Sequence, residues 1–119
     1  MMSTMQEKKS IILIMEHCSG GDLDSYRANS KHGFINEEKC RGFFNQIISG
    51  VDYLHKNFMT HRDIKPANII LDSKHTTPKL IDFGFTNIFD DKEKMKSFLG
   101  SPHFAAPELL TGTKYEGPM

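Results

Sequence analysis

Three short groups of residues in this chain carry side chains that could do chemistry on a phosphate. They are HRDIKPAN at residues 61–68, DFG at residues 82–84 and APE at residues 106–108. In the first group, Asp63 is a carboxylate that could orient a hydroxyl and accept its proton, and Lys65 would bring positive charge to a phosphate. Asn68 and Asp82 offer hard oxygen ligands of the kind that magnesium prefers.

Each group alone is weak evidence for a function. His, Arg and Asp recur together by chance in many loops, and an Asp-Phe-Gly sequence makes a good turn whether or not it does chemistry. The combination is far more specific, because the three groups follow one another in order and Asp82 comes fourteen residues after Asn68.

The composition limits the class of protein. The chain has 119 residues, 38% hydrophobic and 25% charged, which suffices for the core of one domain. Its formal net charge is zero, so charge gives no indication of binding to nucleic acid or a membrane surface. The apolar run at residues 11–15 is too short to span a bilayer. Cys18 and Cys40 have no C-x-x-C spacing, so we expect two free thiols in an intracellular, cytoplasmic protein.

The first part of the chain predicts a strand followed by a short helix. Residues 10–16 form an apolar, β-branched run that is typical of a strand buried on both faces. Two adjacent glycines follow and interrupt it. We expect a short helix at about residues 22–30 and a loop at residues 31–34.

Residues 36–57 give the clearest helical pattern. Asn36 can cap the helix, and two glutamates in the first turn suit its dipole. Apolar residues recur at steps of three and four and predict one buried stripe, made of Cys40, Phe43, Phe44, Ile47, Ile48, Val51 and Leu54.

Two short strands are predicted after the first chemical group. They cover residues 68–72 and 79–82, with a turn at residues 74–78. Residues 90–96 are charged without an apolar stripe, and we expect an exposed loop there. The tail, residues 111–119, shows no regular pattern.

In this order and spacing, the three groups closely resemble the catalytic loop, the metal-binding loop and the end of the activation segment of a protein kinase. The resemblance covers essentially residues 10–118. It implies an α+β, protein-kinase-like fold and phosphoryl transfer from Mg-ATP to Ser or Thr hydroxyls of a protein substrate. Asp63 would be the base, Lys65 would meet the transferring phosphate, and Asn68 and Asp82 would bind Mg2+.

The same resemblance implies a nucleotide site around the first predicted strand. That strand and the residues after it resemble the hinge between the two lobes of a kinase. The backbone carbonyl of Glu16 and the amide of Cys18 would meet the adenine edge, and Asp22 would reach the ribose. Ile70 and Ile81 would pack against the adenine plane and the metal loop.

Four residues resemble parts of a kinase activation mechanism. Arg62 would grip a phosphate on the activation segment, and Ser97 occupies the matching phosphorylation position, which implies an upstream activating kinase. Ser101 resembles the hydroxyl residue that bonds the base and the lysine, and it favours a serine/threonine kinase. Glu108 belongs to the motif that closes the segment.

The closest likeness is to the calmodulin-dependent-kinase-like group, in the branch of the AMP-activated and microtubule-affinity-regulating kinases. The phrases that carry this likeness are SGGDL, DFGFTN and GSPHFAAPE. Ala67 departs from the pattern, because most serine/threonine kinases have glutamate there. A contact to ribose or to a basic substrate residue would then be lost.

We expect a polar segment at residues 1–9 and a partial kinase domain at residues 10–119, running from the hinge to the end of the activation segment. No Gly-rich phosphate loop, strand lysine or partner glutamate precedes Ser10. We expect a structure made of the hinge strand and the upper part of the large lobe, without the small lobe and the end of the large lobe. We expect such a chain to be inactive alone. Two alternatives remain open: a non-catalytic, kinase-derived binding module, and the product of a decaying gene.

Overall fold

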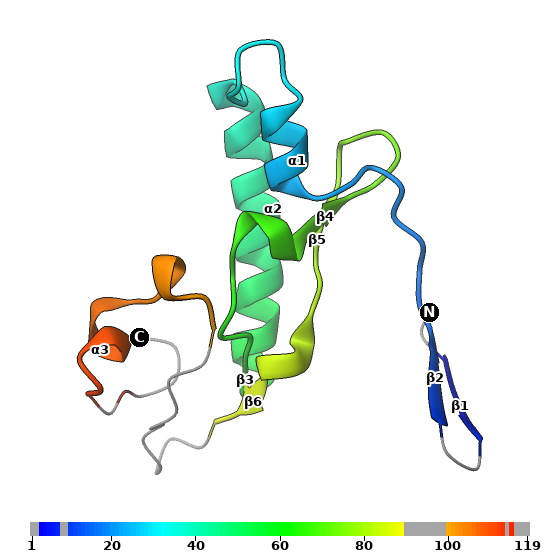
Figure 1. Cartoon of the computed structure of the whole chain (residues 1–119), viewed down its shortest axis with the longest axis vertical. Coiled ribbons are helices and arrows are strands. Elements are labelled where there is room, and N and C mark those ends of the chain that lie inside the picture. Colours follow the sequence, from blue (N-terminus) through cyan, green and yellow to red (C-terminus); the bar gives the residue numbers. More distant parts are fainter. Residues whose placement is uncertain (1–2, 8–9, 90–99, 114, 116–119) are drawn as a thin grey trace.

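The computed structural model describes residues 3–7, 10–89, 100–113 and 115, and it combines helices with short antiparallel strands. Helix α2 (Glu37–Lys56) is the longest element, and shorter elements lie along it, as Figure 1 shows. This mixture is the α+β architecture that the sequence predicts. No helix in the described part of the chain is long and apolar enough to cross a membrane.

Helix α2 begins where the sequence places its cap. The side chain of Asn36 accepts a hydrogen bond from the backbone N–H of Lys39 at 2.9 Å, and two glutamates occupy the first turn. The helix ends before Asn57, within the predicted range. The prediction of this helix is confirmed.

The apolar stripe of α2 is only partly buried, which corrects the expectation of a fully buried stripe. Phe43 and Leu54 are 4% and 7% exposed, whereas Phe44 and Ile48 are 63% and 47% exposed. Among the described elements, β3 and β5 lie against α2 and cover one side of it. Helical periodicity tells which residues share a face, but it does not tell how much of that face a neighbour covers.

Helix α1 (Leu23–Ala28) is shorter than predicted and lies beside the first half of α2. Asp22 caps it, since the carboxylate accepts a hydrogen bond from Ser25 N–H at 2.8 Å. The ring of Tyr26 meets the ring of Phe43 edge to face, with centroids 6.1 Å apart. This contact joins the two helices.

The hairpin of β4 (Ile69–Leu71) and β5 (Pro78–Leu80) forms the centre of the small core. Its antiparallel register pairs Ile69 with Leu80 and Leu71 with Pro78. Leu71 is fully buried and Ile69 is 5% exposed. Both predicted strands are confirmed, although β5 begins and ends earlier than expected.

Strands β3 (Met59–Thr60) and β6 (Asn87–Ile88) pair antiparallel, and neither was predicted. Two residues carry too little periodicity for a strand to be recognised from the sequence. Helix α3 (Pro107–Leu110) is a single turn near the end of the described chain. The predicted loop at residues 90–96 lies outside the described residues.

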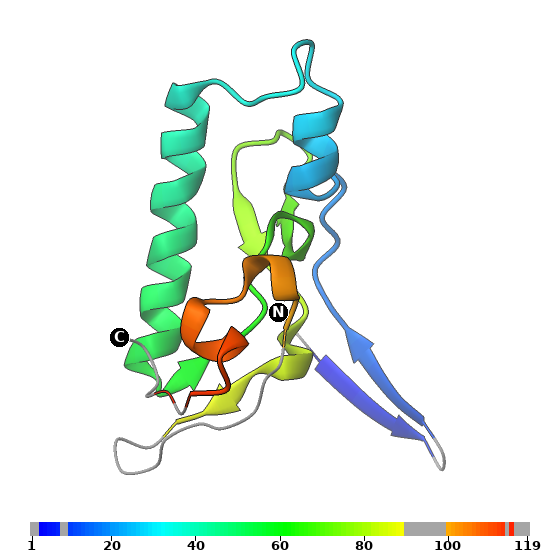
Figure 2. The same cartoon turned by 60° about the vertical axis from the view of Figure 1, so that its left-hand side comes forward.

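Strand β2 (Ser10–Ile14) forms where a strand was predicted, but it is exposed along its whole length. It pairs with β1 (Ser3–Glu7), in the segment for which the sequence suggested only polar character. Figures 1 and 2 show this hairpin projecting away from the helices. The expectation of burial on both faces is therefore wrong in this structure, because β1 is the only described strand beside β2 and no described helix covers either face.

Candidate active site

The loop that carries Asp63 lies between β3 and β4 and is anchored by His61. His61 is 2% exposed, and its Nε2 lies 2.9 Å from the carbonyl oxygen of Ile81. Its ring lies 5.0 Å from the ring of Phe83, centroid to centroid. His61 thus connects the loop of Asp63 with the loop of Asp82.

Asp63 is the centre of a hydrogen-bond network that joins residues far apart in the sequence. Its carboxylate Oδ2 accepts hydrogen bonds from Lys65 Nζ and Asn68 Nδ2, each at 2.8 Å. Oδ1 accepts one from the backbone N–H of Ser101 at 2.9 Å. Lys65 Nζ also donates to Ser101 Oγ at 2.7 Å. The structure therefore brings together four of the residues selected from the sequence.

These contacts determine the charge state of Asp63. Burial, with 5% of the residue exposed, disfavours the charged form and opposes the net effect. The hydrogen bonds from Lys65, Ser101 and Asn68 outweigh burial and lower the pKa of Asp63 below its ordinary value. The carboxylate is therefore ionised at neutral pH and suited to accept a hydrogen bond from a hydroxyl.

Asn68 is 6% exposed, and its amide group has a defined orientation. Nδ2 donates to both the backbone carbonyl of Asp63, at 2.9 Å, and its Oδ2. Because both bonds use the nitrogen, the amide oxygen is the atom that could face a cation.

Asp82 directly follows Ile81, whose backbone is hydrogen-bonded to that of Asn68. The N–H of Ile81 donates to the Asn68 carbonyl at 3.0 Å, so the two candidate metal ligands come from adjacent backbone segments. Asp82 is exposed, has φ of 61° and accepts a hydrogen bond from Gly84 N–H at 3.3 Å. Among the described residues, no three His, Cys, Asp or Glu side chains cluster as a metal site.

Arg62 turns the chain just before Asp63 through a left-handed conformation, with φ of 65°. Its Nε donates to the carbonyl of Phe85 at 2.5 Å. Gly100, with φ of 105°, passes so close that a Cβ there would lie 2.4 Å from the Arg62 carbonyl oxygen. Gly100 was not among the predicted site residues, although a glycine directly before Ser101 was the available signal.

The segment after β2 carries two of the predicted nucleotide contacts. Glu16 is exposed, and its carboxylate accepts a hydrogen bond from Lys79 Nζ on β5. Cys18 is half-buried and, like the exposed Cys40, is a free thiol. Lys79 was not among the predicted site residues, because its acidic partner lies 63 residues away in the sequence.

Asp22 does not extend freely toward a ligand in this structure. Its two carboxylate oxygens accept hydrogen bonds from the N–H and the hydroxyl of Ser25, at 2.8 and 2.7 Å, and these bonds lower the pKa of Asp22. Its backbone forms an antiparallel bridge with Ile70, which is half-buried. Ile81 is 37% exposed and follows β5. The structure thus places Asp22 and Ile70 side by side.

The remaining activation-segment residues are only partly placed. Ser97 lies outside the described residues. Glu108 is half-buried in α3, and its backbone carbonyl accepts hydrogen bonds from Thr113 N–H and Thr111 Oγ1. Among the described residues, the Glu108 carboxylate forms no ion pair.

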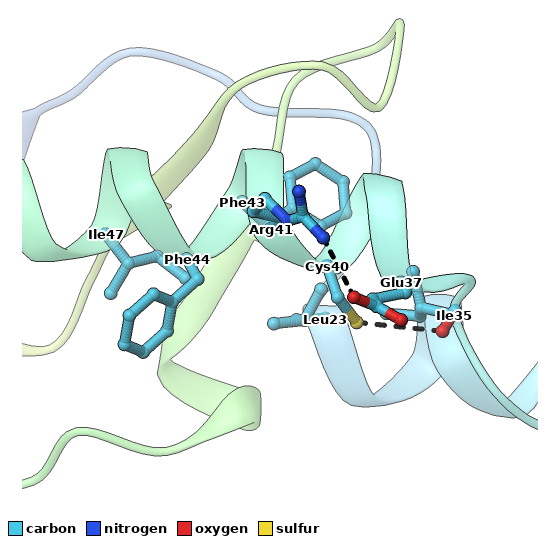
Figure 3. Close-up of a pocket in the computed structure, with 8 residues that line it drawn as sticks. All are labelled: Leu23, Ile35, Glu37, Cys40, Arg41, Phe43, Phe44 and Ile47. Atoms are coloured by element: carbon cyan, nitrogen blue, oxygen red, sulfur yellow. Dashed lines mark hydrogen bonds and ion pairs between the residues drawn. The ribbon is translucent and has the colours of Figure 1, made fainter.

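A groove of about 410 Å³ lies elsewhere, between α1 and the first half of α2, and Figure 3 shows its lining. The lining is mostly apolar and includes no predicted site residue; it consists of Leu23, Ile35, Glu37, Cys40, Arg41, Phe43, Phe44 and Ile47. This groove therefore lies apart from the predicted site.

Comparison with known proteins gives the family. A family model described as the protein kinase domain matches residues 1–119. The chain is 45% identical over 108 residues to serine/threonine protein kinase OSK3 of Oryza sativa subsp. indica, and OSK4 of the same subspecies gives the same values. In each case the match covers 91% of this chain and 21% of the relative, so the chain spans about a fifth of its curated relatives.

The order of the three motifs, the network around Asp63 and the full-length family match agree with one another. The chain therefore belongs to the protein kinase domain family.

Proposed function

We propose that the protein carrying this chain is a serine/threonine kinase that transfers a phosphoryl group from Mg-ATP to protein hydroxyls. The observation that carries this proposal is the buried Asp63 carboxylate, held by Lys65, Asn68 and the Ser101 amide. Three donors, two from the loop of Asp63 itself and one from residue 101, converge on one ionised carboxylate. A solely structural loop does not require a buried carboxylate, a cation and an amide in this arrangement.

Asp63 would orient the substrate hydroxyl and accept its proton. A carboxylate has about four acceptor positions, and the described donors occupy two on Oδ2 and one on Oδ1. By that count, Oδ1 can accept one more hydrogen bond, which the substrate hydroxyl would donate. Because the pKa of Asp63 is lowered, it is a weak base that would take the proton late in the reaction.

Lys65 would contribute charge and position. Its Nζ bridges Asp63 Oδ2 and Ser101 Oγ, at 2.8 and 2.7 Å, beside the place proposed for the hydroxyl. Mg-ATP, when bound, supplies the phosphoryl group and offsets the charge that develops on it. Lys65 would add positive charge on the hydroxyl side of that group.

The residues present fit a magnesium ion. The amide oxygen of Asn68 and the exposed carboxylate of Asp82 are hard oxygen donors on backbone-linked segments. Mg2+ commonly takes one or two protein carboxylates or amides and completes its shell with water and phosphate. Asn68 and Asp82 are thus the proposed ligands.

We further propose that Glu16 and Cys18 contact the adenine through their backbones, with Ile70 and Ile81 as apolar neighbours. The branch of the AMP-activated and microtubule-affinity-regulating kinases remains our proposed placement. The names of the rice relatives support a serine/threonine kinase. The contact of Lys65 with Ser101 Oγ agrees with that class.

Arg62 is the proposed receiver of a regulatory phosphate on Ser97. Among the described residues, its guanidinium uses Nε for the Phe85 carbonyl, and the two terminal nitrogens could bind phosphate oxygens. Phosphorylation of Ser97 by an upstream kinase should then raise activity. An unchanged rate in a Ser97→Ala variant, after treatment with an activating kinase, would contradict this role.

The deciding experiment measures phosphoryl transfer by the whole protein and by its Asp63→Asn variant. We expect the variant to lose at least about a hundredfold in kcat, the range for removal of a general base. Asp52→Asn is the matched control, because Asp52 is an exposed carboxylate on α2 paired with Lys56. Mg-ATP binding and the thermal unfolding midpoint of the variant show whether it is folded.

Retained activity in a folded Asp63→Asn variant would contradict the proposal. Absence of both transfer and Mg-ATP binding in the unaltered protein would leave the non-catalytic binding module as the better reading.

A further inference from the structure

Lys79 makes an ion pair whose position suggests a role in nucleotide binding. It lies on β5, and its Nζ donates to the carboxylate of Glu16, which follows β2. The two residues influence each other, since the bond to Lys79 lowers the pKa of Glu16 and Glu16 raises the pKa of Lys79. Cys18 and Asp72 add smaller effects in the same direction on the pKa of Lys79.

The far end of this segment is held by several other contacts. Gly20 N–H donates to the Leu71 carbonyl at 3.0 Å, and Leu71 N–H donates to the Gly21 carbonyl at 2.8 Å. His75 Nε2 lies 3.1 Å from the Gly20 carbonyl oxygen. These contacts attach residues 20–21 to the β4–β5 hairpin. Among the described residues, the backbone of residues 15–19 makes no such hydrogen bond to the hairpin.

The Lys79–Glu16 pair connects residues 15–19 to the same hairpin. Among the described residues, it is the only hydrogen bond or ion pair that involves residues 15–19. Residues 17–19, with Cys18 among them, lie between this pair and the contacts of Gly20. The segment is therefore held at both ends, and both ends are held to the same hairpin.

We propose that Lys79 is a positioning residue, which holds residues 16–18 in the conformation that presents the Glu16 carbonyl and the Cys18 amide to the nucleotide. This assignment rests on the proposed function. A segment that is already ordered loses less conformational entropy when a ligand binds. Lys79 would thus strengthen nucleotide binding without touching the nucleotide.

The expected effect is modest. The side chains of Lys79 and Glu16 are 34% and 59% exposed, and an exposed ion pair is weak and weakened further by salt. We expect Lys79→Met to raise the Kd for Mg-ATP about two- to fivefold at low salt, with a smaller effect at high salt. The value of kcat should stay unchanged.

The experiment is titration calorimetry of the whole protein with Mg-ATP, together with steady-state kinetics. Lys74→Met is the matched control, because Lys74 is exposed in the turn of the same hairpin. The charge swap Glu16→Lys with Lys79→Glu should restore the affinity lost in Lys79→Met. A role in packing alone would not be rescued by reversing both charges.

Hydrogen exchange provides a readout that does not depend on catalysis. In Lys79→Met the hydrogen-bonded amide of Gly20, at the end of this segment, should exchange faster, and the amides paired between β4 and β5 should not change. Equal exchange and equal Kd in Lys79→Met and the unaltered protein would overturn the positioning role while leaving the proposed function intact. Failure of the unaltered protein to bind Mg-ATP would overturn the proposed function, and this assignment with it.

Discussion

At the scale of single residues, the backbone around the site is held in sparsely populated conformations. Arg62 and Asp82 both have φ near 60°, which costs about 1–3 kcal/mol for a residue other than glycine. Arg62 directly precedes Asp63, and Asp82 directly follows Ile81, whose carbonyl oxygen lies 2.9 Å from Nε2 of His61. These conformations persist because other contacts hold the path of the loop. They are made by His61, by the amide of Ser101 and by the close approach of Gly100.

Hydrogen-bond donors close in sequence also lower the pKa of the Asp72 carboxylate. Asp72 turns the β4–β5 hairpin, and its Oδ1 accepts hydrogen bonds from the N–H groups of Thr76 and Thr77 at 2.7 and 3.0 Å. Bonds to Thr77 and Thr76 lower the pKa of Asp72 from 3.8 to about 2. The folded state therefore prefers the ionised form more than the unfolded state does.

We predict that Asp72 stabilises the fold above about pH 4, where it is ionised in both states, and that this contribution disappears as the pH falls toward 2. The free energy of unfolding of Asp72→Asn should be lower than that of the unaltered chain at pH 6. The difference should shrink steadily below pH 4. A difference that stays constant from pH 6 to pH 2.5 would show that charge plays no part.

At the scale of elements, α2 is the scaffold for the loops of the site. It is followed directly by β3 and the loop of Asp63, and β5 packs along it before the chain reaches Asp82. Its stability therefore bears on the geometry of both loops. The described contacts of its first turn include the cap by Asn36 and an exposed ion pair between Glu37 and Arg41.

We predict that Asn36→Ala destabilises the fold by about 1 kcal/mol, because the N–H of Lys39 loses its acceptor. Asn45→Ala is the matched control, since Asn45 is exposed in the interior of the same helix and alanine is the better helix former. Chemical denaturation followed by circular dichroism measures both. Equal stability of the two variants would show that the cap contributes nothing.

At the scale of the whole molecule, the chain exposes more surface than a compact protein of its size. Its accessible surface is 9090 Å², against about 6,600 Å² for a compact monomer of 13.6 kDa. Its radius of gyration is 16.3 Å, where a compact chain of this length has about 13.5 Å. Exposed apolar side chains on α2 and β2 account for part of this surface.

We predict that the 119-residue chain self-associates when it is prepared alone, because large exposed apolar areas favour association. Phe44 and Ile48 lie four residues apart on the open face of α2. Changing both to glutamine should shift the sedimentation coefficient toward that of a monomer. The same change at the exposed polar pair Asn45 and Ser49 should have no effect. A monomeric unaltered chain would contradict the prediction.

Much of the local structure was determined by the sequence itself. The cap at Asn36, the periodicity that follows it and the two short strands depend on interactions between near neighbours, and these were predicted correctly. The family was also readable, because phosphate chemistry needs particular residue types at spacings that the chain displays without folding. The predicted roles of all the site residues, from Asp63 and Asp82 to Glu16 and Ser97, remain predictions.

Tertiary structure alone decided which groups meet and which faces are covered. The amide of Ser101 reaches Asp63 across 38 residues, and Lys79 reaches Glu16 across 63. It also decided that Phe44 and β2 are exposed, against the prediction. The physical reason is that burial and long-range pairing depend on what packs against a segment. A pattern within the segment reports only which of its own residues share a face.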